Sequence, residues 1–256
     1  MKNTVEKIKS MKGKEKISML TAYDYSTAKY MDQAGINIIL IGDSMGMVVL
    51  GYENTLSVTI NDMMLHTGAV ARGTENALIV GDLPAGAYDD NESAALNAEA
   101  LIKSGADTVK LENAPEIAKF LVENKFEVMG HVGLTPQTMT DFKVQGKEEE
   151  AANTIIKMAK DLEASGCYCV VLEGIPRQLA QKITGMLSVP TIGIGAGPDC
   201  DGQVLVVNDM LGLYDKFSPK FVKKYAHLAD DMKKAFENYI KEVKEGSFPQ
   251  DEHSFH

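Results

Sequence analysis

Four acidic residues stand directly after short apolar runs, at the points where buried strands would end. They occur in Ile41-Gly42-Asp43, Val80-Gly81-Asp82, Lys110-Leu111-Glu112 and Val171-Leu172-Glu173. In a parallel barrel these strand ends share one rim, so residues distant in sequence converge there. Close carboxylates repel one another unless they are protonated or neutralised, and Mg²⁺ is a hard cation that accepts oxygen ligands. We therefore expect an oxygen-rich metal site, although any one of these carboxylates could instead cap the helix that follows.

Three more polar side chains are expected at the same rim. Lys110 lies two positions before Glu112, so both would project from one face of a strand toward the barrel mouth, unless they form an ordinary salt bridge. His131 follows the fifth apolar run between glycines, which indicates either close approach to a ligand or a structural histidine. Ser44 follows Asp43, and no His or Asp spacing makes it a nucleophile. We interpret Ser44 as a hydrogen-bond donor to a substrate.

Two weaker motifs have structural interpretations. The loop Gly193-Ile194-Gly195-Ala196-Gly197 resembles a phosphate loop, but it lacks the Lys-Ser/Thr ending, so a glycine-rich turn beside a ligand is the better interpretation. Cys167 and Cys169 could form a metal pair, but their apolar surroundings favour packing in the core. The role of Cys200 stays open.

The elements that would position these residues are short apolar runs alternating with stretches of helical period, the pattern of repeated βα units. Several runs are apolar at consecutive positions, which is typical of parallel strands covered on both faces. Eight runs and this chain length favour a (β/α)8 barrel over a doubly wound sheet. The runs are Ile17 to Thr21, Ile36 to Ile41, Ala77 to Val80, Thr108 to Leu111, Glu127 to Met129, Cys169 to Leu172, Thr191 to Ile194 and Val204 to Val207.

Helix-start signals lie between the runs. They are Asp24 before Tyr25 to Gln33, Asn91 before Glu92 to Lys103, the segment Ala114-Pro115-Glu116, and the acidic triplet Glu148-Glu149-Glu150. We expect one domain over residues 1–256, with a helical extension at 1–15 and a flexible tail at 246–256.

The amino-acid composition excludes several classes of binding partner and location. The 36 acidic and 26 basic residues give a net charge of -10, which argues against a broad cationic face for nucleic acid. Three cysteines and an N-terminus without an apolar signal favour a reducing cytoplasm. Because no apolar run reaches the roughly 18 residues of a membrane span, we predict a soluble protein.

Eight blocks of residues between about Ile17 and Leu213 stand in an order that is specific to one family. The blocks are Thr21 to Asp24, Gly42 to Tyr52, His66-Thr67, Ala69 to Gly73, Val109 to Glu112, Gly130 to Gln137, Lys143 to Lys147 and Gly193 to Gln203. Through these blocks the sequence resembles the ketopantoate hydroxymethyltransferase family.

This resemblance implies the transfer of a hydroxymethyl group from 5,10-methylenetetrahydrofolate to 3-methyl-2-oxobutanoate. The product would be 2-dehydropantoate, on the route to pantothenate and coenzyme A. The resemblance also implies a barrel of the phosphoenolpyruvate/pyruvate superfamily that holds one Mg²⁺ per subunit. It further implies a cytoplasmic homo-oligomer, commonly a decamer.

The resemblance also implies roles for the rim residues. Asp43, Asp82 and Glu112 would serve the metal, with Glu112 acting directly or through water. Asp43, Ser44, Asp82 and Lys110 would bind the keto acid, and His131 could orient it. Glu173 would be the catalytic base that takes the proton beside the ketone.

Two segments depart from the family pattern, Ala85-Gly86-Ala87 and Thr140-Asp141-Phe142, and both would shape rim loops. The enzymatic alternative is a C–C lyase or phosphoenolpyruvate mutase of the same superfamily, but the Lys-Cys-Gly-His type segment of those lyases is absent. The other alternative is a non-catalytic ligand-binding barrel. Loss of the rim carboxylates would be its signature, and all of them are present.

Overall fold

The computed structural model describes residues 2–138, 143–216 and 219–256. The chain forms two compact units, Met1–Val206 and Val207–His256, and each is described by itself. The single domain expected over residues 1–256 therefore stays a prediction. In the described residues, no helix has both the length and the apolar character needed to cross a membrane.

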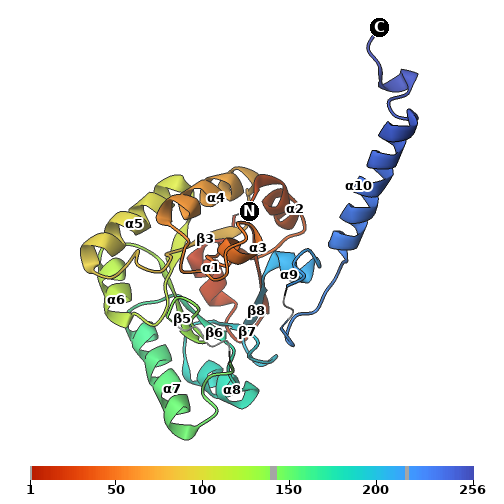
Figure 1. Cartoon of the computed structure of the whole chain (residues 1–256). Coiled ribbons are helices and arrows are strands. Elements are labelled where there is room, and N and C mark those ends of the chain that lie inside the picture. Colours follow the sequence, from red (N-terminus) through yellow and green to blue (C-terminus); the bar gives the residue numbers. More distant parts are fainter. Residues whose placement is uncertain (1, 139–142, 217–218) are drawn as a thin grey trace. The chain divides into compact units, whose positions relative to one another are not determined.

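The first unit is a closed barrel of eight parallel strands in the described part of the chain (Figure 1). Each strand pairs with the next in sequence, and β8 pairs with β1 to close the barrel. The predicted (β/α)8 barrel is thereby confirmed. The strands are β1 Ile17–Thr21, β2 Ile38–Ile41, β3 Leu78–Asp82, β4 Thr108–Lys110, β5 Val128–Gly133, β6 Cys169–Glu173, β7 Thr191–Ile194 and β8 Gly202–Leu205.

Most of the strands are buried on both faces because helices cover their outer side while side chains fill the interior, although Ser18 in β1 and Gln203 in β8 are exposed. Every residue of β2, β3 and β5 is buried. At the N-terminal end of the barrel, the short helix α1 (Val5–Ser10) lies against the interior, since Val5 and Ile8 belong to the same core cluster as Ile38 and Val80. This helix covers the end of the barrel interior where the strands begin.

Helices follow most of the strands and surround the barrel (Figure 1). The connection from β7 to β8 is the exception, because the described structure assigns no helix to residues 195–201. Instead Arg177 braces this connection, donating from Nε to Asp199 Oδ2 over 2.6 Å. The helices are α2 Tyr25–Gln33, α3 Met45–Val48, α4 Ile60–Gly73, α5 Asn91–Ser104, α6 Pro115–Glu123, α7 Glu149–Ala164 and α8 Arg177–Met186.

Helix starts follow local capping chemistry. Asp24 caps α2 as predicted, accepting from Thr27 N over 2.9 Å. The predicted cap of α5 was wrong by one residue, because Asp90 rather than Asn91 is the extended residue whose carboxylate accepts from Ser93 N, over 2.8 Å. Asn91 is already the first residue of that helix.

The eighth strand was also misplaced, since the prediction was Val204 to Val207 and β8 is Gly202–Leu205. The cause is Gly202, which pairs with Ile17 in β1 so closely that a Cβ would lie 2.5 Å from the Ile17 carbonyl oxygen. Only glycine allows this approach. Val207 begins the next helix instead.

The second unit contains α9 (Val207–Met210), α10 (Leu228–Glu245) and a 3-10 turn at Asp251–His253. No residue of α10 is buried. Its large apolar side chains recur at helical spacing and are between 46% and 58% exposed. They are Met232, Phe236, Tyr239, Ile240 and Val243. The flexible tail expected at 246–256 stays a prediction.

Candidate active site

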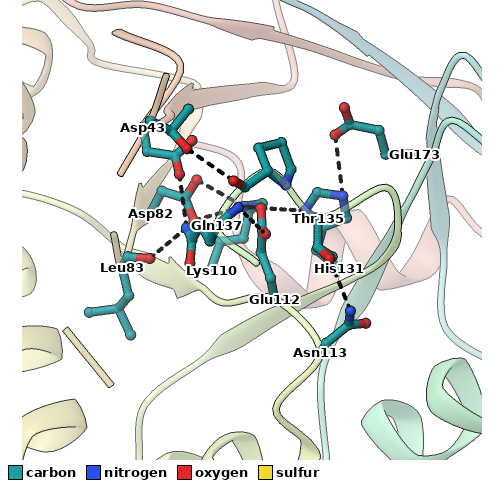
Figure 2. Close-up of polar contacts among 12 residues, drawn as sticks. Asp43, Asp82, Leu83, Lys110, Glu112, Asn113, His131, Thr135, Gln137 and Glu173 are labelled. Atoms are coloured by element: carbon teal, nitrogen blue, oxygen red, sulfur yellow. Dashed lines mark hydrogen bonds and ion pairs between the residues drawn. The ribbon is translucent and has the colours of Figure 1, made fainter. Parts of the chain in front are cut away.

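Consecutive strands bring the predicted rim residues together at the C-terminal mouth of the barrel (Figure 2). Asp82 ends β3, Lys110 ends β4 and Glu173 ends β6, while His131 lies within β5 and Asp43 follows β2. Asp82 and Lys110 are register partners on neighbouring strands, so their side chains start side by side. Asp82, His131 and Glu173 therefore belong to their strands rather than following them, because β3, β5 and β6 run further toward the rim than the apolar runs indicate.

Lys110 is the cation at the centre of this group. Its Nζ donates to both carboxylate oxygens of Asp82, over 2.7 and 2.8 Å, and lies 3.5 Å from Glu112 Oε1. Burial opposes the charged amine, but the carboxylates around it outweigh burial and raise the pKa of Lys110 above its usual value. Glu112 lies beyond the end of β4, so its contact with Lys110 comes from the loop rather than from a shared strand face.

His131 lies between two carboxylates (Figure 2). Its Nδ1 is 3.1 Å from Glu112 Oε1, and its Nε2 is 3.2 Å from Glu173 Oε2, although neither contact has the alignment of a hydrogen bond. Burial disfavours the imidazolium, yet the charge of Glu112 outweighs it and raises the pKa of His131 to about 9. Burial would also raise the pKa of Glu112, but His131 and Lys110 hold that pKa at about 2.

Asp43 and Asp82 are the two carboxylates of this group whose pKa values are raised. Burial, followed by the charge of Asp82, raises the pKa of Asp43 to about 8. Burial also raises the pKa of Asp82, against the opposing effect of Lys110. Asp43 Oδ2 accepts a hydrogen bond from Gln137 Nε2 over 3.0 Å. Ionising these two buried carboxylates is therefore costly, and a hard divalent cation would stabilise their negative charge.

The present arrangement limits how many carboxylates such a cation could reach. Within residues 2–138, 143–216 and 219–256, no group of three His, Cys, Asp or Glu side chains is arranged to hold a metal ion. One physical reason is that Lys110 and His131 lie next to Asp82 and Glu112. The oxygen donors of Asp43 and Asp82 fit the chemistry of Mg²⁺, and Asp82 would share its oxygens between the metal and Lys110.

Ser44 belongs to a chain of contacts that involves Tyr23 and His66. It precedes α3 but makes no capping bond with its side chain; its Oγ lies 2.9 Å from Tyr23 OH instead. The carbonyl oxygen of Tyr23 lies 2.6 Å from His66 Nδ1. Tyr23 and His66 stood in the blocks that carried the family resemblance, but no pattern in the sequence linked them to Ser44.

Sequence reasoning also missed Tyr88 and Gln137. Tyr88 OH donates to Gln137 Oε1 over 2.5 Å and accepts from Glu112 N over 3.3 Å. Both side chains come from loops, which have no periodicity, so only the position of Gln137 in the block Gly130 to Gln137 gave any signal. Tyr88 follows the atypical segment Ala85-Gly86-Ala87, in which Gly86 has φ +77° and open space where a Cβ would stand. The other atypical segment, Thr140-Asp141-Phe142, lies outside the described residues.

Comparison with known proteins gives one consistent family. The family model for ketopantoate hydroxymethyltransferase matches residues 2–251. The 3-methyl-2-oxobutanoate hydroxymethyltransferase of Enterococcus faecalis is 54% identical over 264 aligned positions, covering 100% of this chain and 96% of that protein. The enzyme of the same name from Syntrophus aciditrophicus is also 54% identical, covering 99% of this chain and 97% of that protein.

Solved structures support the fold. A 2,3-dimethylmalate lyase of the PEP mutase/isocitrate lyase superfamily aligns with a TM-score of 0.66 and 14% identity, covering 98% of this chain and 92% of that one. Phosphonopyruvate hydrolase in complex with oxalate and Mg²⁺ aligns with a TM-score of 0.65 and 9% identity, covering 98% of this chain and 93% of that one. At these identities the likeness concerns the barrel alone.

Proposed function

The chain belongs to the ketopantoate hydroxymethyltransferase family, and we propose that the acidic barrel mouth is where it acts as a 3-methyl-2-oxobutanoate hydroxymethyltransferase. The reaction joins the one-carbon unit of 5,10-methylenetetrahydrofolate to 3-methyl-2-oxobutanoate and yields 2-dehydropantoate and tetrahydrofolate. The observation that carries the assignment is the convergence of Asp43, Asp82, Glu112 and Glu173 around Lys110 and His131 at one mouth.

Mg²⁺ is the proposed metal, with Asp43 and Asp82 as direct ligands and Glu112 acting through water. Support comes from the raised pKa of Asp43, which reflects negative charge that burial leaves uncompensated. When bound there, Mg²⁺ would supply Lewis-acid stabilisation of negative charge on the substrate's oxygens. The Mg²⁺ that accompanies oxalate in phosphonopyruvate hydrolase is consistent with this choice.

The keto acid would bind through its carboxylate and carbonyl oxygens. Lys110 presents a buried ammonium already oriented by both oxygens of Asp82, so little order is lost when an anion arrives. Ser44 would donate a hydrogen bond to the substrate, with its hydroxyl held by Tyr23. His131 stays charged because its pKa is about 9, and it would orient the substrate from the β5 side.

Glu173 is the proposed base. Its side chain is 17% exposed, more than those of its neighbours at 2–4%, so it faces the space into which a substrate would enter. Its carboxylate would take the proton from C3 of 3-methyl-2-oxobutanoate and leave an enolate. That carbon then forms the new bond to the one-carbon unit. Both C–N bonds of that unit to the folate break, water supplies the hydroxyl oxygen, and the two folate nitrogens take up the proton from C3 and one proton from water. His131, whose Nε2 lies 3.2 Å from Glu173 Oε2, would orient this carboxylate through its charge.

We also propose that the protein is a cytoplasmic homo-oligomer, and a decamer as the family resemblance implies. Support for a reducing compartment comes from its cysteines, since Cys167, Cys169 and Cys200 are all free and buried. Support for assembly comes from the apolar face of α10, whose side chains are about half exposed.

The direct test incubates the protein with 3-methyl-2-oxobutanoate, 5,10-methylenetetrahydrofolate and Mg²⁺, and measures 2-dehydropantoate. Proton transfer is isolated by leaving out the folate and following the exchange of the C3 proton in deuterated water. The variant Glu173→Gln should lose this exchange. The matched control is Glu127→Gln, which changes an exposed glutamate at the opposite end of β5. Undiminished exchange in Glu173→Gln would move the base elsewhere.

The metal assignment is tested by removing either the ion or a ligand. EDTA should abolish product formation, and added Mg²⁺ should restore it. The variant Asp82→Asn should lower activity by orders of magnitude while its circular dichroism spectrum stays that of the wild type. Full activity in EDTA would exclude a metal-dependent reaction.

A further inference from the structure

Gln137 is buried at the barrel mouth although it comes from the loop that follows β5. Its side chain is 6% exposed. The loop is fixed nearby, because Thr135 Oγ1 accepts from Asn113 Nδ2 over 3.2 Å. The backbone N–H of Gln137 donates to Glu112 Oε2 over 3.3 Å. Its side chain reaches Asp43, so this one residue touches two of the three carboxylates proposed to serve the metal (Figure 2).

The partners of the Gln137 amide determine which way it points. Nε2 lies 3.0 Å from the carbonyl oxygen of Leu83 and 3.0 Å from Asp43 Oδ2, while Oε1 accepts from Tyr88 OH. A backbone carbonyl can only accept a hydrogen bond, so the NH₂ group must face Leu83. The reversed amide would set its oxygen against both the carbonyl and the carboxylate. Gln137 therefore presents a donor to Asp43.

We propose that Gln137, held by Tyr88, is a positioning residue that fixes the Asp43 carboxylate in the rotation needed to bind a divalent cation. The amide ties down one oxygen, Oδ2, and so limits the directions in which the other can point. The carbonyl oxygen of Leu83 accepts from the same nitrogen of the amide, and Tyr88 donates to the amide oxygen. The inference rests on the proposed function, because it supposes that Asp43 is a metal ligand.

The expected loss of Mg²⁺ affinity can be estimated from other metal sites in which a side chain hydrogen-bonds to a metal ligand. Hydrogen-bond partners that orient ligating side chains change metal affinity or activity by roughly 10–100-fold when they are removed. A purely structural role predicts a different result, since loss of buried hydrogen bonds would lower the stability of the fold without changing the affinity for the cation.

The experiment measures Mg²⁺ binding directly, by titration calorimetry on the EDTA-treated and dialysed full chain without substrates. The variants are Gln137→Leu, which keeps the bulk but removes the donor, and Tyr88→Phe, which removes one hydroxyl. Gln137→Leu should weaken Mg²⁺ binding by about 10–100-fold, and Tyr88→Phe should weaken it less. The matched controls are Gln33→Leu and Tyr30→Phe on the exposed side of α2, and both should bind Mg²⁺ as the wild type does.

A second measurement separates positioning from chemistry. Raising Mg²⁺ should restore turnover in Gln137→Leu, because the defect lies in the cation affinity. Wild-type Mg²⁺ affinity in both site variants would overturn the inference, even if their thermal stability fell. If the wild type itself binds no Mg²⁺, the proposed metal site and this inference both fail. If the wild type binds Mg²⁺ and both site variants bind it equally tightly, the inference fails but the proposed function stands. Should Gln137→Leu not fold, Tyr88→Phe decides alone.

Discussion

The chemistry of the mouth depends on charge that burial leaves uncompensated. Glu112 is neutralised by contacts with Lys110 and His131, which hold its pKa at about 2. Asp43 has an amide as a partner rather than a cation, and its pKa rises to about 8. Asp43 is therefore a carboxylate that is costly to ionise unless another positive charge arrives. A residue of this kind lowers the stability of the ligand-free protein, and binding of a cation would offset that loss.

Asp43 gives a prediction about pH and stability in the metal-free protein. Its pKa is raised in the folded state, so its contribution to stability is complete below the unfolded value near 4 and is lost as the pH rises through 8. Asp43→Asn removes the free-energy cost of ionising this buried carboxylate in the folded state. In EDTA the variant should therefore be more stable than the wild type, and the difference should grow by up to about 4 kcal/mol between pH 5 and pH 8. Urea unfolding at the two pH values measures it.

The control for this prediction is Asp24→Asn, which changes an exposed capping aspartate on α2. It should show no such growth between the two pH values. The Asp43→Asn variant should also be catalytically inactive, despite its greater stability. A variant that is less stable than the wild type at pH 8 would show that Asp43 is ionised and paired in the folded protein.

The rule that strand ends converge located the charged residues but not the residues that support them. Asp82 and Glu173 could be found because an apolar run leads directly to each of them. Gln137 and Tyr88 could not, because their contacts depend on how two loops fold over the mouth. Loop positions follow from tertiary packing, which one sequence does not reveal.

Among the elements, the helix starts show how finely the sequence specifies local structure. Asp90 and Asn91 are adjacent, and both are residue types that cap helices. The structure selects Asp90 because its backbone is extended and Ser93 completes a capping box. The sequence therefore predicted the existence and type of α5 but not its first residue, which depends on the path of the preceding chain.

This choice gives a paired prediction. Asp90→Ala should cost about 1 kcal/mol of unfolding free energy, the usual loss for a helix cap. Asn91→Ala should cost nothing or stabilise slightly, because Asn91 is already inside the helix, where alanine has the higher helix propensity. Urea denaturation of the two variants measures the difference. Equal losses would mean that the capping bond between Asp90 and Ser93 contributes little in solution.

At the scale of the whole molecule, the barrel could be predicted by counting apolar runs in the sequence, whereas the second unit could not be predicted in this way. Eight runs predict a closed barrel because parallel strands covered on both faces are apolar throughout. The long helix α10 had no such signal, because an amphipathic helix is compatible with packing inside one chain or between chains. Its exposed apolar face is the feature that bears on assembly.

Assembly gives the last prediction. Phe236 lies at the centre of the apolar face of α10 and is 57% exposed. If that face is covered by another copy of the chain, Phe236→Glu should replace a buried ring by a charge and raise the dissociation constant of the oligomer by at least about tenfold, since burying such a ring is worth 1.5–3 kcal/mol. Sedimentation velocity should then show smaller species than the wild type. Asn238→Glu adds the same charge away from this face of the helix and should leave the assembly intact. Equal sedimentation of both variants and the wild type would exclude α10 as the contact between subunits.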